Sequence, residues 1–231
     1  MLHFLIVQLG SQDLMTTALA SIERFAGECN VDIVKLPDST TDPRAHGQAI
    51  DDWRKFQHIA VKDVVVVMDP DVVLLSERWR IEVEAAFASG VGIWGAGNQH
   101  AWGPRVHAHM MVISGSVFNS LERSFTPCLD VREQDWRDTG GLYCMWARAA
   151  GWKVRPVEQG RDWHGVSAGY SHPAGMANGC RALWAHLGGG SHSDVKRMTW
   201  RQQYLSAWRR REIAKRKRFL RAAHTHLSSH S

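Results

Sequence analysis

The sequence contains few cysteines and no long apolar run. Its four cysteines, Cys29, Cys128, Cys144 and Cys180, show no CxxC spacing, so neither a zinc knuckle nor a disulfide framework is indicated. The N-terminal stretch MLHFLIVQLG is too short to cross a bilayer, and it has neither a basic flank nor a small-residue cleavage site. We therefore expect a cytoplasmic chain without an integral membrane segment.

Acidic residues are scarce near the C-terminus. The segment 196–221 holds eleven Lys or Arg residues and one acidic residue, whereas the chain before it is net negative. Such a split predicts an anionic partner for the C-terminal segment, either nucleic acid or a membrane surface. The alternative is a solvated charged helix that packs onto the domain through its aromatic residues. We expect a globular domain over 1–195, and over 196–231 a basic helix with an aromatic stripe that ends in a disordered Ser/His tail.

Apolar patterns alternate between strand and helix periods along the first half of the chain. Strands are predicted at 3–9, 31–36, 64–68 and 91–96, a strand running into a turn at 107–118, and helices at 12–26, 48–59, 77–88 and 141–150. This alternation predicts an α/β fold with a mostly parallel central sheet flanked by helices. The Gly-, Ser- and His-rich stretch 163–179 is expected to be a loop.

Two carboxylates follow a β-branched run in VVVVMDPDVVLL, residues 64–75. Because charged side chains are costly inside a buried strand, Asp69 and Asp71 should lie where the strand leaves the sheet. The carboxyl ends of such strands are common ligand sites. Two acids around a proline could hold Mg²⁺ or Mn²⁺, and the alternative is a solvated turn.

A glycine-rich stretch, WAHLGGGSHS at 184–193, lies near the end of the expected domain and is expected to form a loop. Backbone amides around Gly189 and Ser191 could approach an anion, while His186 and His192 offer imidazoles as metal ligands or phosphate donors. The alternative is a flexible linker.

Further candidate groups lie between these two motifs. Glu133, Asp135 and Asp138 precede a predicted helix, where Asp138 could cap the helix or one of the acids could act as a general base. His107 and His109 should share one face of a strand, and we favour substrate contact or burial over a second metal site for them.

In this order the motifs resemble those of GT-A glycosyltransferases, especially the family 2-like branch, over residues 3–192. The resemblance implies a GT-A type nucleotide-diphospho-sugar transferase fold. It assigns Asp38 in PDSTTD to the nucleotide base, Asp69 in MDPD to ribose or metal, and Asp71 and His186 to a Mn²⁺ or Mg²⁺ ion. It assigns the role of general base to Asp138 in DTGGLYCMW.

The sequence departs from the family pattern at two places. The acids before the last motif read REQD where the family has Glu-Asp, which leaves Asp135 or Glu133 as alternative bases. The first strand ends in QLGSQD where the family has Tyr-Asn, so Gly10 occupies the nucleotide-contacting position. Gly189, Ser191 and His192 complete the expected nucleotide contacts.

The resemblance implies a metal-dependent, inverting transfer of a sugar from a nucleotide-diphosphate sugar, with a UDP-sugar expected. For the acceptor we favour hydroxymethylated pyrimidine in DNA, because a basic arm on a compact transferase resembles phage-type enzymes; the setting would then be the host cytoplasm. The alternatives are a lipid-linked or cell-surface glycan at a membrane, a phosphoryl or nucleotidyl transfer, and a non-enzymatic nucleic-acid-binding protein.

Overall fold

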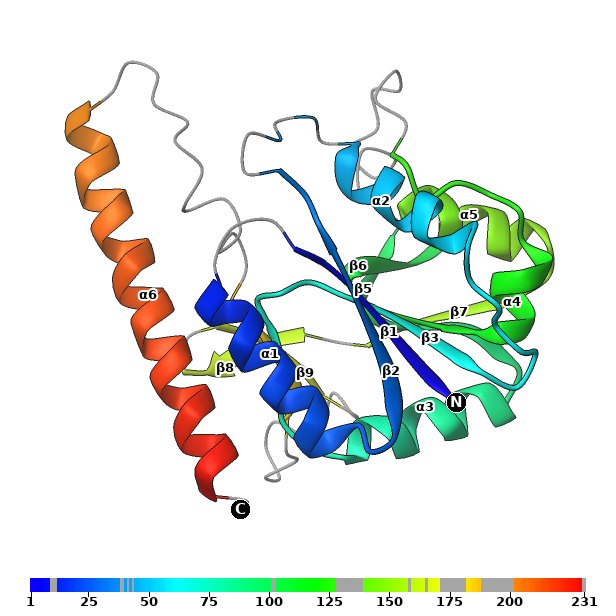
Figure 1. Cartoon of the computed structure of the whole chain (residues 1–231), viewed down its shortest axis with the longest axis horizontal. Coiled ribbons are helices and arrows are strands. Elements are labelled where there is room, and N and C mark those ends of the chain that lie inside the picture. Colours follow the sequence, from blue (N-terminus) through cyan, green and yellow to red (C-terminus); the bar gives the residue numbers. More distant parts are fainter. Residues whose placement is uncertain are drawn as a thin grey trace.

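The chain folds into a layered α/β structure with two sheets and six helices in its described part (Figure 1). The computed structural model describes residues 1–8, 12–37, 40, 42, 44–100, 103–127, 139–157, 159–164, 166–170, 182–187 and 202–229. The predicted α/β class is confirmed.

The main sheet has the strand order β2-β1-β3-β6-β5-β7. Five of its strands run in one direction, and only β6 is antiparallel to its neighbours β3 and β5. The predicted mostly parallel sheet is thus confirmed. Its strands are β1 (Leu2–Gln8), β2 (Cys29–Lys35), β3 (Val64–Met68), β5 (Val91–His100), β6 (Gly103–Ser114) and β7 (Lys153–Val157).

Helices cover both faces of this sheet, which explains its continuous apolar strands. Phe4 and Ile6 of β1 pack toward α1 and α3, whereas Leu5 of β1 packs toward α2, α4 and α5, because successive side chains of a strand point to opposite faces. The helices are α1 (Gln12–Phe25), α2 (Ala45–Arg54), α3 (Arg78–Ala88), α4 (Gly115–Ser120), α5 (Gly141–Ala149) and α6 (Gln202–Ser229).

A smaller antiparallel sheet lies beside the main one. Its order is β4-β10-β9-β8, with β4 (Val72–Leu74), β8 (Gln159–Trp163), β9 (Val166–Tyr170) and β10 (Ala182–His186). The prediction of a loop over 163–179 is therefore wrong for 166–170, and the loop predicted at 184–193 is wrong for 184–186. Gly169 explains part of the error, because a Cβ there would come within 2.2 Å of the Trp184 ring. The glycine makes room for a packed indole rather than marking a loop.

Two predicted boundaries also differ. Residues 115–118, where a strand was expected to run into a turn, begin α4, because the Ser114 hydroxyl accepts a hydrogen bond from the Val117 amide and caps a helix there. Helix α2 begins at Ala45 and ends at Arg54 instead of spanning 48–59.

The basic helix α6 packs against the globular part of the chain. Phe219 and Ala223 are fully buried among side chains of α1, β4 and β9, and Arg216 forms an ion pair with Asp13 of α1. The helix continues through Ser229, so the disordered Ser/His tail predicted from composition is helical to that residue. Among the described helices, none combines the length and apolarity needed to cross a bilayer.

Candidate metal site

The turn between β3 and β4 carries the two aspartates from one sheet to the other. The Asp69 amide donates to the His109 carbonyl at 3.0 Å, which continues the β3–β6 ladder, and the Val72 amide donates to the Asp69 carbonyl at 3.1 Å, which closes the turn. Asp69 and Asp71 therefore lie at the carboxyl end of β3, where the two sheets meet. This is the position predicted from the valine run.

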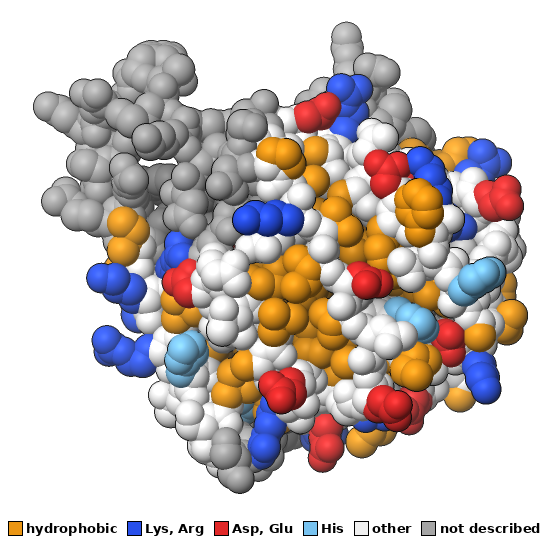
Figure 2. All heavy atoms as spheres, in the orientation of Figure 1, with side chains coloured by type: hydrophobic (Ala, Val, Ile, Leu, Met, Phe, Trp, Pro, Cys, Tyr) orange, Lys and Arg blue, Asp and Glu red, His pale blue; other side chains and the backbone are white. Residues whose placement is uncertain are grey.

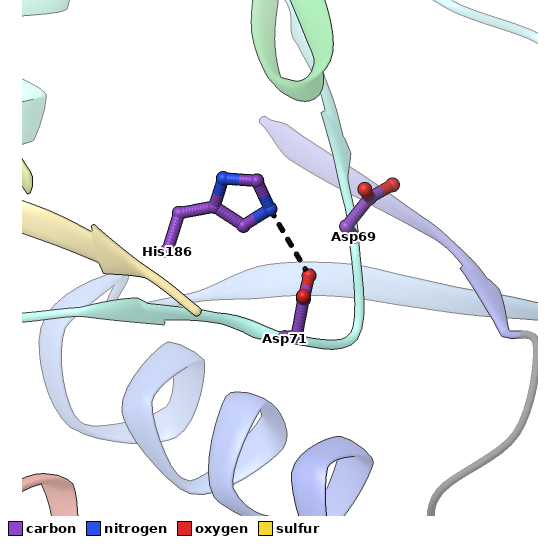
Figure 3. Close-up of side chains that lie close together, drawn as sticks. All are labelled: Asp69, Asp71 and His186. Atoms are coloured by element: carbon purple, nitrogen blue, oxygen red, sulfur yellow. Dashed lines mark ion pairs between the residues drawn. The ribbon is translucent and has the colours of Figure 1, made fainter. Parts of the chain in front are cut away.

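His186 reaches the same point from a distant part of the sequence. It is the last residue of β10 and pairs with Val72 of β4, and the amide of Leu187 donates to the Asp71 carbonyl at 3.1 Å. The His186 Nε2 atom lies 3.3 Å from Asp71 Oδ1 (Figure 3). One ligand atom from each of Asp69, Asp71 and His186 lies within 4.8 Å of the others, so the structure brings together the three residues predicted to bind metal.

Burial makes the charges of this cluster strongly interdependent. The Asp71 residue is 1% exposed, and a buried carboxylate requires a nearby cation to offset its lost hydration. Burial alone would lower the pKa of His186, but the hydrogen bond and negative charge of Asp71, with a further contribution from Asp69, outweigh it and raise that pKa. The site is thus built to hold positive charge against two carboxylates.

More histidines surround the cluster than the sequence motifs indicated. His46, near the start of α2, places Nε2 3.3 Å from Asp69 Oδ1. The rings of His107 and His109 stack with centroids 5.5 Å apart, which confirms that they share a face, and His109 stacks on His186 at 4.0 Å. Burial, followed by the charges of His186, His107 and His46, lowers the pKa of His109.

Sequence reasoning missed His46. The available signal was its place in HGQAIDDW at a helix start, which only a long-range contact with the turn after β3 makes meaningful.

The donor atoms of the cluster suit a hard or borderline divalent cation. Two carboxylates and one imidazole are ligands that Mn²⁺ accepts and that Mg²⁺ accepts in part. The buried Asp71 carboxylate facing the His186 ring fits such an ion, because a divalent charge would offset both acids at once.

The other predicted site residues lie outside the described residues. They are the nucleotide-contacting Gly10, Asp38, Gly189, Ser191 and His192 and the candidate bases Glu133, Asp135 and Asp138.

The chain that borders the base candidates is anchored on both sides. On one side, Asp51 of α2 accepts hydrogen bonds from the Phe125 amide at 2.8 Å and the Thr126 hydroxyl at 2.8 Å. On the other, Thr139 is buried, and a Cβ on Gly140 would meet the Met111 methyl group at 2.5 Å. The described residues on either side of 128–138 are therefore attached to α2 and to β6, the strand that contributes His109.

The chain is similar in structure to known proteins. No protein-family model matches the chain, and no curated protein sequence matches it. Among solved structures it is similar to a mutant of β-1,4-galactosyltransferase 7 from Drosophila, crystallised with manganese, UDP-Gal and xylobiose. The two share 13% identity over 88% of this chain and 78% of that one, with a TM-score of 0.48.

Proposed function

We propose that the protein is a metal-dependent glycosyltransferase that uses a nucleotide-diphosphate sugar. The observation that carries the proposal is the convergence of Asp69, Asp71 and His186 at the carboxyl end of β3, where α/β sheets bind ligands. A divalent cation bound there would supply positive charge to a leaving diphosphate. The resemblance of the sequence motifs to GT-A enzymes supports the same chemistry.

In this proposal each group of the chain has a separate task. Asp69, Asp71 and His186 hold the cation, and His46 orients the Asp69 carboxylate, from which its Nε2 lies 3.3 Å. Asp138, with Asp135 and Glu133 as alternatives, removes the proton from the attacking acceptor hydroxyl. Gly10, Asp38, Gly189, Ser191 and His192 contact the nucleotide. Attack from the face opposite the leaving group gives inversion.

For the acceptor we propose a hydroxymethylated pyrimidine in DNA, with a UDP-sugar as donor. The basic composition of the C-terminal segment supports an acceptor that carries phosphate. A lipid-linked glycan on an anionic membrane would satisfy the same charge and is the second candidate.

The donor half is tested by thermal-shift measurements with UDP-, GDP-, ADP- and TDP-sugars, with and without Mn²⁺. We expect a shift for one nucleotide that requires Mn²⁺ and disappears in Asp71→Asn, because a ligand that binds only the folded state raises its melting temperature. Asp52→Asn is the matched control, since Asp52 is exposed and pairs only with Lys55 among the described residues. It should keep the full shift.

Transfer itself is then measured as nucleoside diphosphate release with hydroxymethylated DNA, unmodified DNA or a lipid-linked acceptor. Release that depends on hydroxymethylated DNA supports the favoured acceptor, and release only with the lipid identifies the second candidate. Absence of a nucleotide-sugar shift, together with DNA binding that Asp71→Asn does not change, would refute the transferase proposal in favour of a binding protein.

A further inference from the structure

A cavity lies between α6 and the β8–β9 turn, and none of the three candidate metal ligands lines it. It has a volume of about 430 Å³ and is lined from α6 by Arg218, Arg221, Ala222, Thr225, His226 and Ser229 and from the turn by Trp163 and His164. We call it the α6 groove. The Trp163 ring packs edge-on against the buried Phe219 at 5.9 Å, so the same contact that attaches α6 to the domain also fixes one wall of the groove.

The lining of the α6 groove is cationic and rich in hydrogen-bond donors. Among the described side chains it contains two guanidinium groups, two imidazoles and two hydroxyls, and no carboxylate. The His226 imidazole already contacts the Leu75 carbonyl, and the Ser229 hydroxyl donates to the His226 carbonyl. Arg218 and Arg221 are three residues apart and therefore extend from the same side of the helix. Neither pairs with a carboxylate in the part of the chain that the structure describes, in contrast to Arg216, which pairs with Asp13.

The turn that closes the groove has an unusual backbone. His164 has a φ of +51°, and it is the one non-glycine residue with a positive φ among those described. This conformation is uncommon for residues other than glycine, with Asn, Asp and His its most frequent occupants, and it carries a cost. The His164 ring packs edge-on against Trp163 at 4.9 Å, so this turn places an aromatic and an imidazole opposite the two arginines.

We propose that the α6 groove binds the phosphate groups of a nucleic-acid strand. The forked guanidinium matches phosphate geometry and holds it by charge-assisted hydrogen bonds, and an indole beside a cationic track offers a surface on which a base can stack. Arg211 is exposed two helical turns before Arg218, roughly 10 Å along the axis. Cationic side chains therefore extend beyond the groove, as binding of a polyanion requires and binding of a single small anion does not. Figure 2 shows Lys and Arg side chains at the left edge of the molecule, where α6 lies in Figure 1.

This inference deepens the acceptor half of the proposed function and is independent of its donor half. It assigns particular residues on one face of α6 to the contact, instead of the whole basic segment.

The test is fluorescence anisotropy with a labelled single-stranded oligonucleotide, titrated at several salt concentrations. The variant is Arg218→Gln with Arg221→Gln. The matched control is Lys217→Gln with Lys62→Gln, which removes the same charge from exposed positions outside the groove. We expect the groove variant to bind at least 10-fold more weakly. Its slope of log affinity against log salt should be smaller by about 1.4, because each lost contact to a single strand removes about 0.7.

Four further outcomes are decisive. The control pair should bind within about 2-fold of wild type, and equal losses in both double variants would overturn the groove in favour of diffuse charge. Competition by inorganic phosphate at the same concentration of phosphate groups as the oligonucleotide would overturn a strand as the ligand. Binding of phosphatidylserine vesicles through Arg218 and Arg221, without oligonucleotide binding, would also overturn it.

The donor and acceptor proposals fail separately in this design. Asp71→Asn should retain oligonucleotide binding, and the groove variant should retain its Mn²⁺-dependent shift with a nucleotide sugar. If no nucleotide sugar shifts the wild type but the groove variant still loses the oligonucleotide, the donor proposal fails and the groove assignment stands.

Discussion

At the scale of single residues, the candidate site combines ligands that the sequence identified with neighbours that it did not. Asp69 and Asp71 were identifiable because two acids after a valine run are anomalous inside a sheet. His186 was identifiable as part of a glycine-rich motif. His46 and the stacking of His109 on His186 depend on contacts between distant segments, which no local pattern contains.

The neighbour His46 should matter for metal affinity. Its Nε2 lies 3.3 Å from Asp69 Oδ1, and loss of a group that orients a metal ligand commonly costs 10- to 100-fold in affinity. We expect His46→Ala to weaken Mn²⁺ binding about 10-fold in isothermal titration calorimetry, less than Asp71→Asn. The control is His58→Ala, which removes an imidazole from an exposed position later in the chain. This variant should bind Mn²⁺ like wild type. Equal affinities for the two histidine variants would contradict this role.

The buried carboxylate of Asp63 predicts that the free energy of unfolding decreases at acidic pH. Burial would raise the pKa of Asp63, but hydrogen bonds from the Met1 ammonium group, the Ala60 amide and His3 outweigh it and lower the pKa to about 2. Because the folded-state pKa is depressed, this carboxylate contributes stability above its unfolded pKa near 3.8, and that contribution is lost as the pH falls toward 2.

Urea unfolding at pH 7, 4, 3 and 2.5 checks this expectation. Asp63→Asn should be less stable than wild type at pH 7, and the difference should shrink below pH 4. Asp52→Asn, which changes an exposed acid, should follow the wild-type pH profile. A constant difference between Asp63→Asn and wild type across the series would refute the explanation.

At the scale of elements, the strongly patterned segments were predictable and the sparsely patterned ones were not. β1, α1, β3, α3 and α5 lie close to their predicted ranges, because each has an apolar period long enough to specify its type. β9 and β10 were predicted as loops. Their glycine and histidine content is explained only by packing, as with Gly169 beneath Trp184, and by the position of His186 beside Asp71.

Helix α6 is the element whose attachment can be measured. Phe219 is fully buried between α1 and the smaller sheet, so Phe219→Ala should lower the free energy of unfolding by about 3 to 5 kcal/mol. Ile213→Ala on the same helix removes a side chain that is 45% exposed and should change it by less than about 0.5 kcal/mol. Denaturant titration monitored by tryptophan fluorescence measures both. A loss below about 1 kcal/mol in Phe219→Ala would show that α6 is not part of the folded unit.

At the scale of the whole molecule, the candidate metal site is the junction of the two sheets. β3 belongs to the main sheet, whereas β4 and β10 belong to the smaller one, so its three ligands join two layers. The sequence predicted one central sheet and not this second one, because pairing of β4 with β10 joins segments more than a hundred residues apart.

Metal binding should therefore stabilise the smaller sheet as well as the turn after β3. In hydrogen exchange measured by mass spectrometry, Mn²⁺ should slow exchange in peptides covering 72–75 and 182–187, where the Leu187 amide bonds the Asp71 carbonyl. Peptides from β2, at the far edge of the main sheet, should exchange as before. Protection confined to 69–71, or protection that persists in Asp71→Asn, would contradict a site that joins the sheets.

The late position of His186 in the chain has a consequence for biosynthesis. During translation Asp69 and Asp71 leave the ribosome long before β10 has been made, and β10 is the one strand that pairs with β4 in the described part of the chain. The nascent chain thus holds an incomplete set of donors for most of its synthesis. The complete cation site forms only after β10 has been released and has paired with β4. Metal binding by the nascent chain therefore requires that this pairing has taken place.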